Sequence, residues 1–149
     1  MKIKAFLDTN VLLDVLQTSR PGSEYSPVIF QAIWDRKIEA VVTTQSLIDA
    51  AYMAEKAGVQ QVFLDFANKC CDYINIDSIN SFDIRFACKN YQGDFEDDAQ
   101  YYRAQDTRCD VFVTSDKDFH KKYQGRDPFL QFLTPQEFVK RMEFRKLTR

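Results

Sequence analysis

The sequence predicts a three-layer α/β sandwich in which a central, mostly parallel sheet of about five strands has helices on both faces. Short apolar runs, several of them rich in β-branched residues, alternate along the chain with longer segments whose apolar residues recur every three or four positions. No internal repeat, low-complexity segment or linker interrupts the 149 residues. We therefore expect a single domain over residues 1–149.

The apolar runs have the length and composition of buried strands. The first run ends abruptly at Asp8, which places a carboxylate at the carboxyl end of its strand. The fourth run, which ends at Thr114, is rich in valine and shows the same change from apolar to acidic residues. In chain order, the expected strands cover residues 3–7, 37–43, 73–76, 110–114 and 129–133.

The segments between these runs carry helix signals. In residues 59–71, Val62, Phe63 and Phe66 recur at helical spacing, and Gly58 is suited to end the helix before them. The expected helices cover residues 9–17, 26–36, 44–57, 59–71, 78–89, 95–108, 117–123 and 136–144. Their expected N-caps all carry side-chain oxygens: Thr9 or Asn10, Ser26, Thr43 or Thr44, Ser78 or Ser81, Asp94, Ser115 or Asp116, and Thr134.

Composition narrows the class of protein. No stretch approaches the roughly 20 apolar residues of a membrane span, and the apolar run before Asp8 is too short for a signal peptide, so we expect a cytoplasmic protein without a membrane partner. A net charge of -2 argues against broad coating of nucleic acid, but it does not exclude a nuclease that uses bound cations. The cysteines show no CxxC spacing, which favours free thiols over a zinc site.

Acidic residues follow two of the predicted strands and begin one helix. Asp8 follows the first strand, Asp116 and Asp118 follow the fourth, and Asp94, Glu96, Asp97 and Asp98 crowd the start of the helix at 95–108. Because the carboxyl ends of parallel strands share one edge of a sheet, these groups are expected to converge there. Asp49 lies among apolar residues, where a carboxylate is costly unless it is paired or binds a metal.

Each acid also has a purely structural interpretation. Asp94 and Asp116 suit helix N-caps, and acids in a first turn interact favourably with the helix dipole. Asp14 suits a supporting or surface role. If the acids do converge, carboxylate oxygens select Mg²⁺ or Mn²⁺, and a metal of this kind can activate water against a phosphodiester.

Several segments together resemble the PIN-domain ribonucleases, especially small bacterial stand-alone members and the toxins of toxin–antitoxin pairs. The matching segments are residues 6–14 (FLDTNVLLD), 43–49 (TTQSLID), 94–97 (DFED), 113–119 (VTSDKDF) and 133–138 (LTPQEF). They occur in the family's order over nearly the whole chain.

The resemblance implies roles for individual residues. The family's four metal-binding and catalytic acids fall on Asp8, Asp49, Asp97 and Asp116, with Asp49 standing where many members have Glu. Asp98 stands where many relatives carry Ala, and it is expected to face solvent or to lie behind the other acids. The supporting residues are Asn10, Asp94, Thr114 and Asp118, and Thr114 is expected to position Asp116 or a water molecule. The basic residues after the fourth strand, expected to guide the RNA backbone, are Lys117, Lys121, Lys122 and Arg126.

We therefore expect a Mg²⁺- or Mn²⁺-dependent endoribonuclease that hydrolyses RNA phosphodiester bonds, with an antitoxin protein and a second copy of the chain as expected partners. The main alternative is a non-catalytic PIN-fold module that binds RNA or protein. A phosphohydrolase or receiver-like pocket is less well supported, because Asp8 and Asn10 do not form the Asp-x-Asp pair that a phosphatase of that kind uses.

Overall fold

Five parallel strands form the centre of the molecule. The computed structural model describes residues 2–144, and its strands lie in the order β3-β2-β1-β4-β5. Every pairing between neighbouring strands is parallel. The strands are β1 (Lys4–Leu7), β2 (Glu39–Thr43), β3 (Asn75–Asp77), β4 (Val111–Val113) and β5 (Gln131–Leu133). The predicted parallel sheet is confirmed, and all five strands are shorter than the apolar runs that predicted them.

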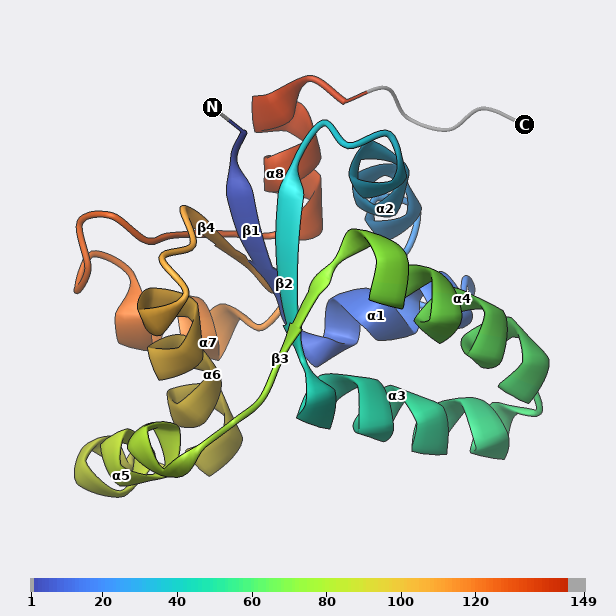
Figure 1. Cartoon of the computed structure of the whole chain (residues 1–149). Coiled ribbons are helices and arrows are strands. Elements are labelled where there is room, and N and C mark those ends of the chain that lie inside the picture. Colours follow the sequence, from blue (N-terminus) through green and yellow to red (C-terminus); the bar gives the residue numbers. More distant parts are fainter. Residues whose placement is uncertain (1, 145–149) are drawn as a thin grey trace.

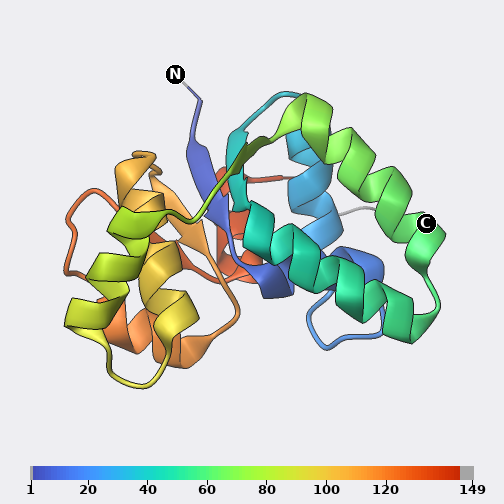
Figure 2. The same ribbon diagram turned by 60° about the horizontal axis from the view of Figure 1, so that its bottom comes forward.

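Helices cover both faces of this sheet (Figure 1). The helices are α1 (Thr9–Leu16), α2 (Ser26–Trp34), α3 (Thr44–Ala57), α4 (Gln60–Tyr73), α5 (Ser81–Asn90), α6 (Phe95–Asp106), α7 (Lys117–Tyr123) and α8 (Pro135–Met142). One face packs against α1–α4 and α8, and the other packs against α6 and α7, with α5 lying along α6 as Figure 2 also shows. Within residues 2–144, no helix is long and apolar enough to span a bilayer.

A hydrophobic core lies on each side of the sheet, which explains why β4 (VFV) is apolar throughout and β1 (KAFL) is apolar after its first residue. On β1, Ala5 and Leu7 belong to the larger core, whereas Phe6 between them points to the smaller one. In the smaller core, the ring of Phe6 stacks on that of Phe112 with their centroids 4.8 Å apart. Successive side chains of β1 and β4 point to opposite faces of the sheet, and both faces are buried. The carboxyl ends of these two strands are therefore fixed in the middle of the molecule.

Most of the expected helix caps are confirmed, and three are wrong. Thr43, Asp94, Asp116 and Thr134 accept backbone N–H groups as N-caps, and Gly58 ends α3 with φ 73°. The corrected N-caps are Asp8 for α1, Tyr25 for α2 and Asn80 for α5. For α1 and α5 a longer carboxylate or amide side chain reaches the first N–H groups, and α2 begins one residue early without any side-chain cap.

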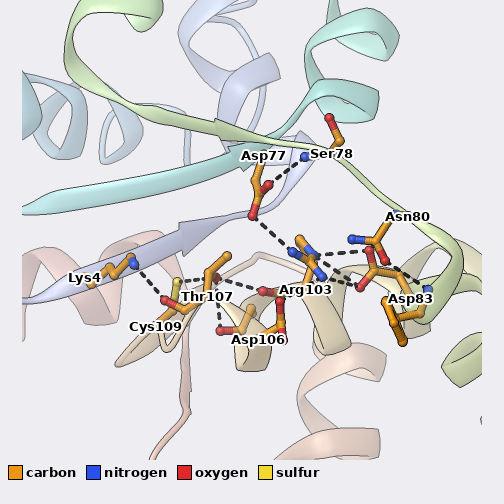
Figure 3. Close-up of polar contacts among 11 residues, drawn as sticks. Lys4, Asp77, Ser78, Asn80, Asp83, Arg103, Asp106, Thr107 and Cys109 are labelled. Carbon is orange, nitrogen blue, oxygen red and sulfur yellow. Dashed lines mark hydrogen bonds and ion pairs between the residues drawn. The ribbon is translucent and has the colours of Figure 1, made fainter.

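A buried arginine fixes α5 and α6 to the edge of the sheet (Figure 3). The Arg103 guanidinium donates to the fully buried Asp83 at 3.0 Å and to Asp77, at the end of β3, at 3.2 Å. It also pairs with Asp106 one turn further along α6 at 3.0 Å. A planar guanidinium can satisfy several carboxylates at once, so Arg103 sets the position of α6, whose first turn carries the acidic run.

Candidate active site

Asp8 is held rigidly at the carboxyl end of β1. Its Oδ1 accepts the Thr9 N–H at 2.7 Å, and its Oδ2 accepts the Asn10 side-chain amide at 2.9 Å and the Thr114 hydroxyl at 2.7 Å. Only 7% of Asp8 is exposed. Burial raises the pKa of its carboxyl above the ordinary value despite these hydrogen bonds, and the carboxylates of Asp116 and Asp94 raise it further.

Thr114 links Asp8 to Asp116. The Thr114 hydroxyl, which donates to Asp8, also accepts the backbone N–H of Asp116 at 3.1 Å. Asp116 in turn caps α7, and its Oδ1 accepts the N–H groups of Asp118 at 2.9 Å and of Phe119 at 3.3 Å. The ends of β1 and β4 therefore bring two carboxylates to one edge of the sheet, with Asp118 in the exposed first turn of α7 beside them.

The first turn of α6 contributes Asp97 to the same neighbourhood. Its backbone N–H donates to Asp94, the N-cap, at 3.0 Å. Burial, followed by the nearby carboxylates of Asp94 and Asp8, raises the pKa of Asp97 to about 8, and Asp116 adds to the effect. Acids from three separate elements thus repel one another at this edge of the sheet.

Asp49 lies at the α3 side of the site, where Gln45 donates to its Oδ1 at 3.0 Å. The expectation that its apolar neighbours enclose it is wrong. Helical periodicity turns Ala50 into the core and leaves Ile48 66% exposed, so Asp49 is only half-buried. Asp49 is nevertheless close to the cluster. After burial, the charge of its carboxylate is the largest cause of the raised pKa of Glu96 on α6.

Glu96 is a site residue that the sequence did not single out. Its pKa is raised by burial, by the charges of Asp49, Asp8 and Asp94, and by a hydrogen bond with Asp49. Glu96 therefore lies between Asp49 on α3 and the acids at the carboxyl end of β1 and the start of α6. Its place among several acids in one helical turn was the available signal, but nothing local distinguished it from a residue that only favours the helix dipole.

Of the two positions expected for Asp98, the solvent-facing one is wrong, because the side chain lies inside the molecule. It is fully buried and accepts hydrogen bonds from the Lys122 ammonium and the Tyr123 hydroxyl, both on α7. The Lys122 ammonium also reaches the backbone oxygen of Asn90 at 3.5 Å. This arrangement fastens α6, which carries Asp97, to α7, which Asp116 caps. Asp14 is also buried, and it accepts from Arg20 at 2.9 Å and Ser26 at 2.8 Å.

A cavity of about 600 Å³ opens beside the acids. Its lining combines carboxylates with cations: Asp94, Asp97, Asp116, Asp118, Lys121, Lys122 and Arg126. Lys117 is exposed on the same helix but does not line it. Such a lining can bind an anionic chain on one part of its surface and a cation on another.

The acids of the cluster are not neutralised by ion pairs, although basic side chains line the cavity beside them. Among residues 2–144, none of its acids forms an ion pair with Lys or Arg; they are Asp8, Asp49, Asp94, Glu96, Asp97 and Asp116. In the same part of the chain, no group of three or more Asp, Glu, His or Cys side chains is arranged so that it could hold a metal ion. These carboxylates therefore have the right chemistry for a hard divalent cation, but their positions in the described residues do not form a closed set of ligands.

Comparison with known proteins identifies the family. A model of the PIN domain matches residues 4–118, most of the chain. The chain belongs to the PIN-domain family. It is 22% identical to ribonuclease VapC1 of Aquifex aeolicus (strain VF5) over 143 residues, which cover 93% of this chain and 94% of that protein.

Solved structures share this PIN fold. A toxin–antitoxin complex from Klebsiella pneumoniae matches with a TM-score of 0.59 at 20% identity, covering 88% of this chain and 97% of the matched chain. VapBC2 from Rickettsia felis, bound to a DNA fragment from its promoter, matches with a TM-score of 0.59 at 12% identity, covering 89% and 98%. At these identities the similarity shows the fold alone.

A buried cluster of hydroxyl groups, centred on Ser46, lies behind the acids of this PIN domain. The Ser46 hydroxyl oxygen lies 2.7 Å from that of Thr9 and accepts the Thr43 hydroxyl at 3.0 Å. The Gln100 amide reaches the same oxygen at 3.5 Å. Ser46 therefore joins the starts of α1 and α3 to α6 directly behind the site. The sequence offered no signal for this role, because a serine in the first turn of a helix is common at unrelated positions.

Proposed function

We propose that this chain is a Mg²⁺- or Mn²⁺-dependent endoribonuclease that uses Asp8, Asp49, Asp97 and Asp116. The observation that carries the proposal is the convergence of Asp8, Asp97 and Asp116 from three elements at one edge of the sheet, where Thr114 joins Asp8 to Asp116 and Asp97 lines the same cavity as Asp116. Burial and the neighbouring carboxylates raise the pKa of Asp97 to about 8, which agrees with this crowding. Acids held close together without cationic partners are a common sign of a functional site. Membership of the PIN-domain family and the similarity to a protein named ribonuclease VapC1 support the same reaction.

The chemistry of the donors fits a hard divalent cation. Mg²⁺ and Mn²⁺ prefer carboxylate oxygens and keep several bound waters, so a site need not supply every ligand. The side chains must approach one another on binding, since no three of the described acids already form a closed set. Neutralising their mutual repulsion favours that approach. Once bound, the cation would lower the pKa of a water molecule and stabilise charge on the scissile phosphate.

The chain's own residues position these groups. Thr114 and Asn10 fix the direction of the Asp8 carboxylate, and Asp94 holds the first turn of α6 so that Asp97 stays near Asp8. Lys121 and Arg126 line the cavity beside Asp116, where they would attract the phosphates that follow the cleaved bond. Lys122 is partly neutralised by Asp98, and Lys117 would act at the rim.

We also propose that the protein is the toxin of a toxin–antitoxin pair, inhibited by a small protein partner, and that it forms a homodimer. The matching structures, a toxin–antitoxin complex and VapBC2, support the first part. Exposed apolar side chains on α3 and α4 provide material for a protein contact: Ile48, Tyr52, Val62 and Leu64.

Cleavage and metal binding test this proposal together. The purified chain should cleave single-stranded RNA with Mg²⁺ or Mn²⁺ and lose the activity in EDTA. Asp8→Asn and Asp97→Asn should each abolish cleavage and weaken Mn²⁺ binding by calorimetry. Asp72→Asn changes an exposed acid on α4 and serves as the matched control, with both properties unchanged. Full cleavage by the first two variants would show that the assigned acids are wrong.

Two observations favour a second candidate, a PIN module that binds RNA or protein without cleaving it. The described acids are not arranged to hold a metal as they stand, and Asp49 has a shorter side chain than the Glu that many family members carry. For this candidate, Mn²⁺ would show no saturable binding to the purified chain, and RNA affinity would be the same in EDTA.

A further inference from the structure

A second cavity, of about 230 Å³, begins where the acid cluster ends. It lies between the start of α3 and the α5–α6 pair, and most of its lining is apolar. The lining residues are Thr43, Gln45, Ile79, Ile84, Phe95, Glu96, Ala99 and Gln100. Glu96 belongs to both places, since it lines this cavity and the carboxylates of Asp49, Asp8 and Asp94 are close enough to raise its pKa. A molecule bound at the acids is therefore adjacent to this cavity.

One wall of the cavity is an aromatic ring that is partly exposed to solvent. Phe95 is the first residue of α6 and is 39% exposed, and Ile84 on α5 is 42% exposed. Apolar side chains of this size are stabilised by a flat apolar partner, and aromatic rings stack well on nucleobases.

The cavity is also lined by a buried side-chain amide, that of Gln100, whose oxygen accepts no hydrogen bond from residues 2–144. Gln100 is 2% exposed, and its side-chain nitrogen donates to Glu96 at 3.3 Å and reaches Ser46 at 3.5 Å. Among residues 2–144, its Oε1 has no hydrogen-bond partner although it is buried. A buried acceptor without a partner costs free energy, so a ligand that donates an N–H to it would bind favourably after a small movement of the side chain.

We infer that this cavity receives one nucleobase of the RNA, next to the phosphate that lies at the acids. A base has two apolar faces, which suit Phe95 and Ile84, and an edge of N–H and C=O groups, which suits Gln100 and Gln45. The volume is below the roughly 300 Å³ at which sites for drug-sized ligands begin, so it holds a single ring system. Sequence-specific RNA recognition uses unstacked bases in this way.

This inference rests on the proposed ribonuclease function, because the acids define where the phosphate lies. A protein side chain could also fill an apolar cavity. The observations favour a base, since Glu96 joins the cavity to the acids and the lining carries two amides that can read hydrogen-bonding edges. Gln100 is then the residue that determines which base is accepted, and Phe95 the residue that binds it.

Binding measured without cleavage tests the inference. In an Asp8→Asn background with Mg²⁺ present, fluorescence anisotropy would follow short fluorescein-labelled homopolymers of adenosine, cytidine and uridine. Phe95→Ala should weaken binding of the preferred homopolymer by about tenfold, the usual effect of losing one stacked base. Gln100→Met keeps the shape of the side chain and should reduce the difference in affinity between homopolymers. Phe129→Ala, on an 84% exposed ring outside both cavities, should change neither property.

The outcomes are separable from those of the proposed function. Affinities for Phe95→Ala within twofold of the parent, together with unchanged base preference in Gln100→Met, would overturn the inference and leave the cavity to a protein side chain. Because no step of the measurement needs hydrolysis, a chain that fails to cleave RNA but shows the expected losses would overturn the nuclease function and support the base site. Circular dichroism of each variant verifies folding.

Discussion

The Thr114 hydroxyl donates to Oδ2 of Asp8 at 2.7 Å, across the boundary between β4 and β1. The same oxygen accepts the Asp116 N–H at 3.1 Å. One buried threonine thus orients two acids of the candidate metal site, and the carboxylate of Asp116 adds to the effect of burial in raising the pKa of Asp8. Residues that hydrogen-bond to metal ligands commonly have a large effect on the affinity for the metal.

Thr114→Val is expected to weaken Mn²⁺ binding by about tenfold or more, because valine keeps the shape but leaves Asp8 without its donor. Isothermal titration calorimetry with Mn²⁺ measures the change. Thr107→Val is the matched control, since its hydroxyl donates to the Arg103 carbonyl at 2.8 Å, on the loop that follows α6. Both variants should lose stability, but only Thr114→Val should lose affinity; equal affinities would remove Thr114 from the site.

Asp97→Asn is expected to raise stability at neutral pH in EDTA. The folded-state pKa of Asp97 is about 8 against an ordinary 3.8, so the folded chain keeps a proton that the unfolded chain releases between these values. Stability from this group is therefore complete below pH 3.8 and falls as the pH rises to about 8. Urea unfolding at several pH values should show a difference between the two proteins that grows over this window. A constant difference would contradict the raised pKa.

Mn²⁺ affinity is expected to increase with pH up to about 8, because binding requires the Asp97 carboxylate and expels its proton. Calorimetry in two buffers with different ionisation enthalpies counts the protons released. Near pH 7 the wild-type chain should release protons on binding, and Asp97→Asn should release fewer. Glu137→Gln changes an acid on α8 with a lowered pKa, and its proton release should match the wild type.

Local signals in the sequence were sufficient for the sheet and for several helix ends. The acid at the end of β1, the cap at Asp94 and the left-handed Gly58 each depend on residues within one turn of chain. The environment of Asp49 could not be read in this way, since apolar neighbours on a helix point in different directions. Its partner Glu96 belongs to another helix, and only the folded sheet brings them together.

Asp98 shows the same limit most clearly. In the sequence it is one more acid in a first turn, where solvent exposure is the usual outcome. Its burial depends on Lys122 and Tyr123, which lie 24 and 25 residues further along the chain. A fully buried carboxylate needs such partners, and the packing of α7 against α6 supplies both.

Asp98→Ala is expected to lower the free energy of unfolding by about 3–5 kcal/mol, because it leaves the Lys122 ammonium without its buried partner. The double variant Asp98→Ala with Lys122→Met removes both charges and should recover much of that loss, as measured by urea unfolding. Additive losses would show that the pair is not coupled. Because the pair fastens α6 to α7, Asp98→Ala should also weaken Mn²⁺ binding at temperatures where it stays folded, whereas Asp106→Ala, an exposed acid at the far end of α6, should not.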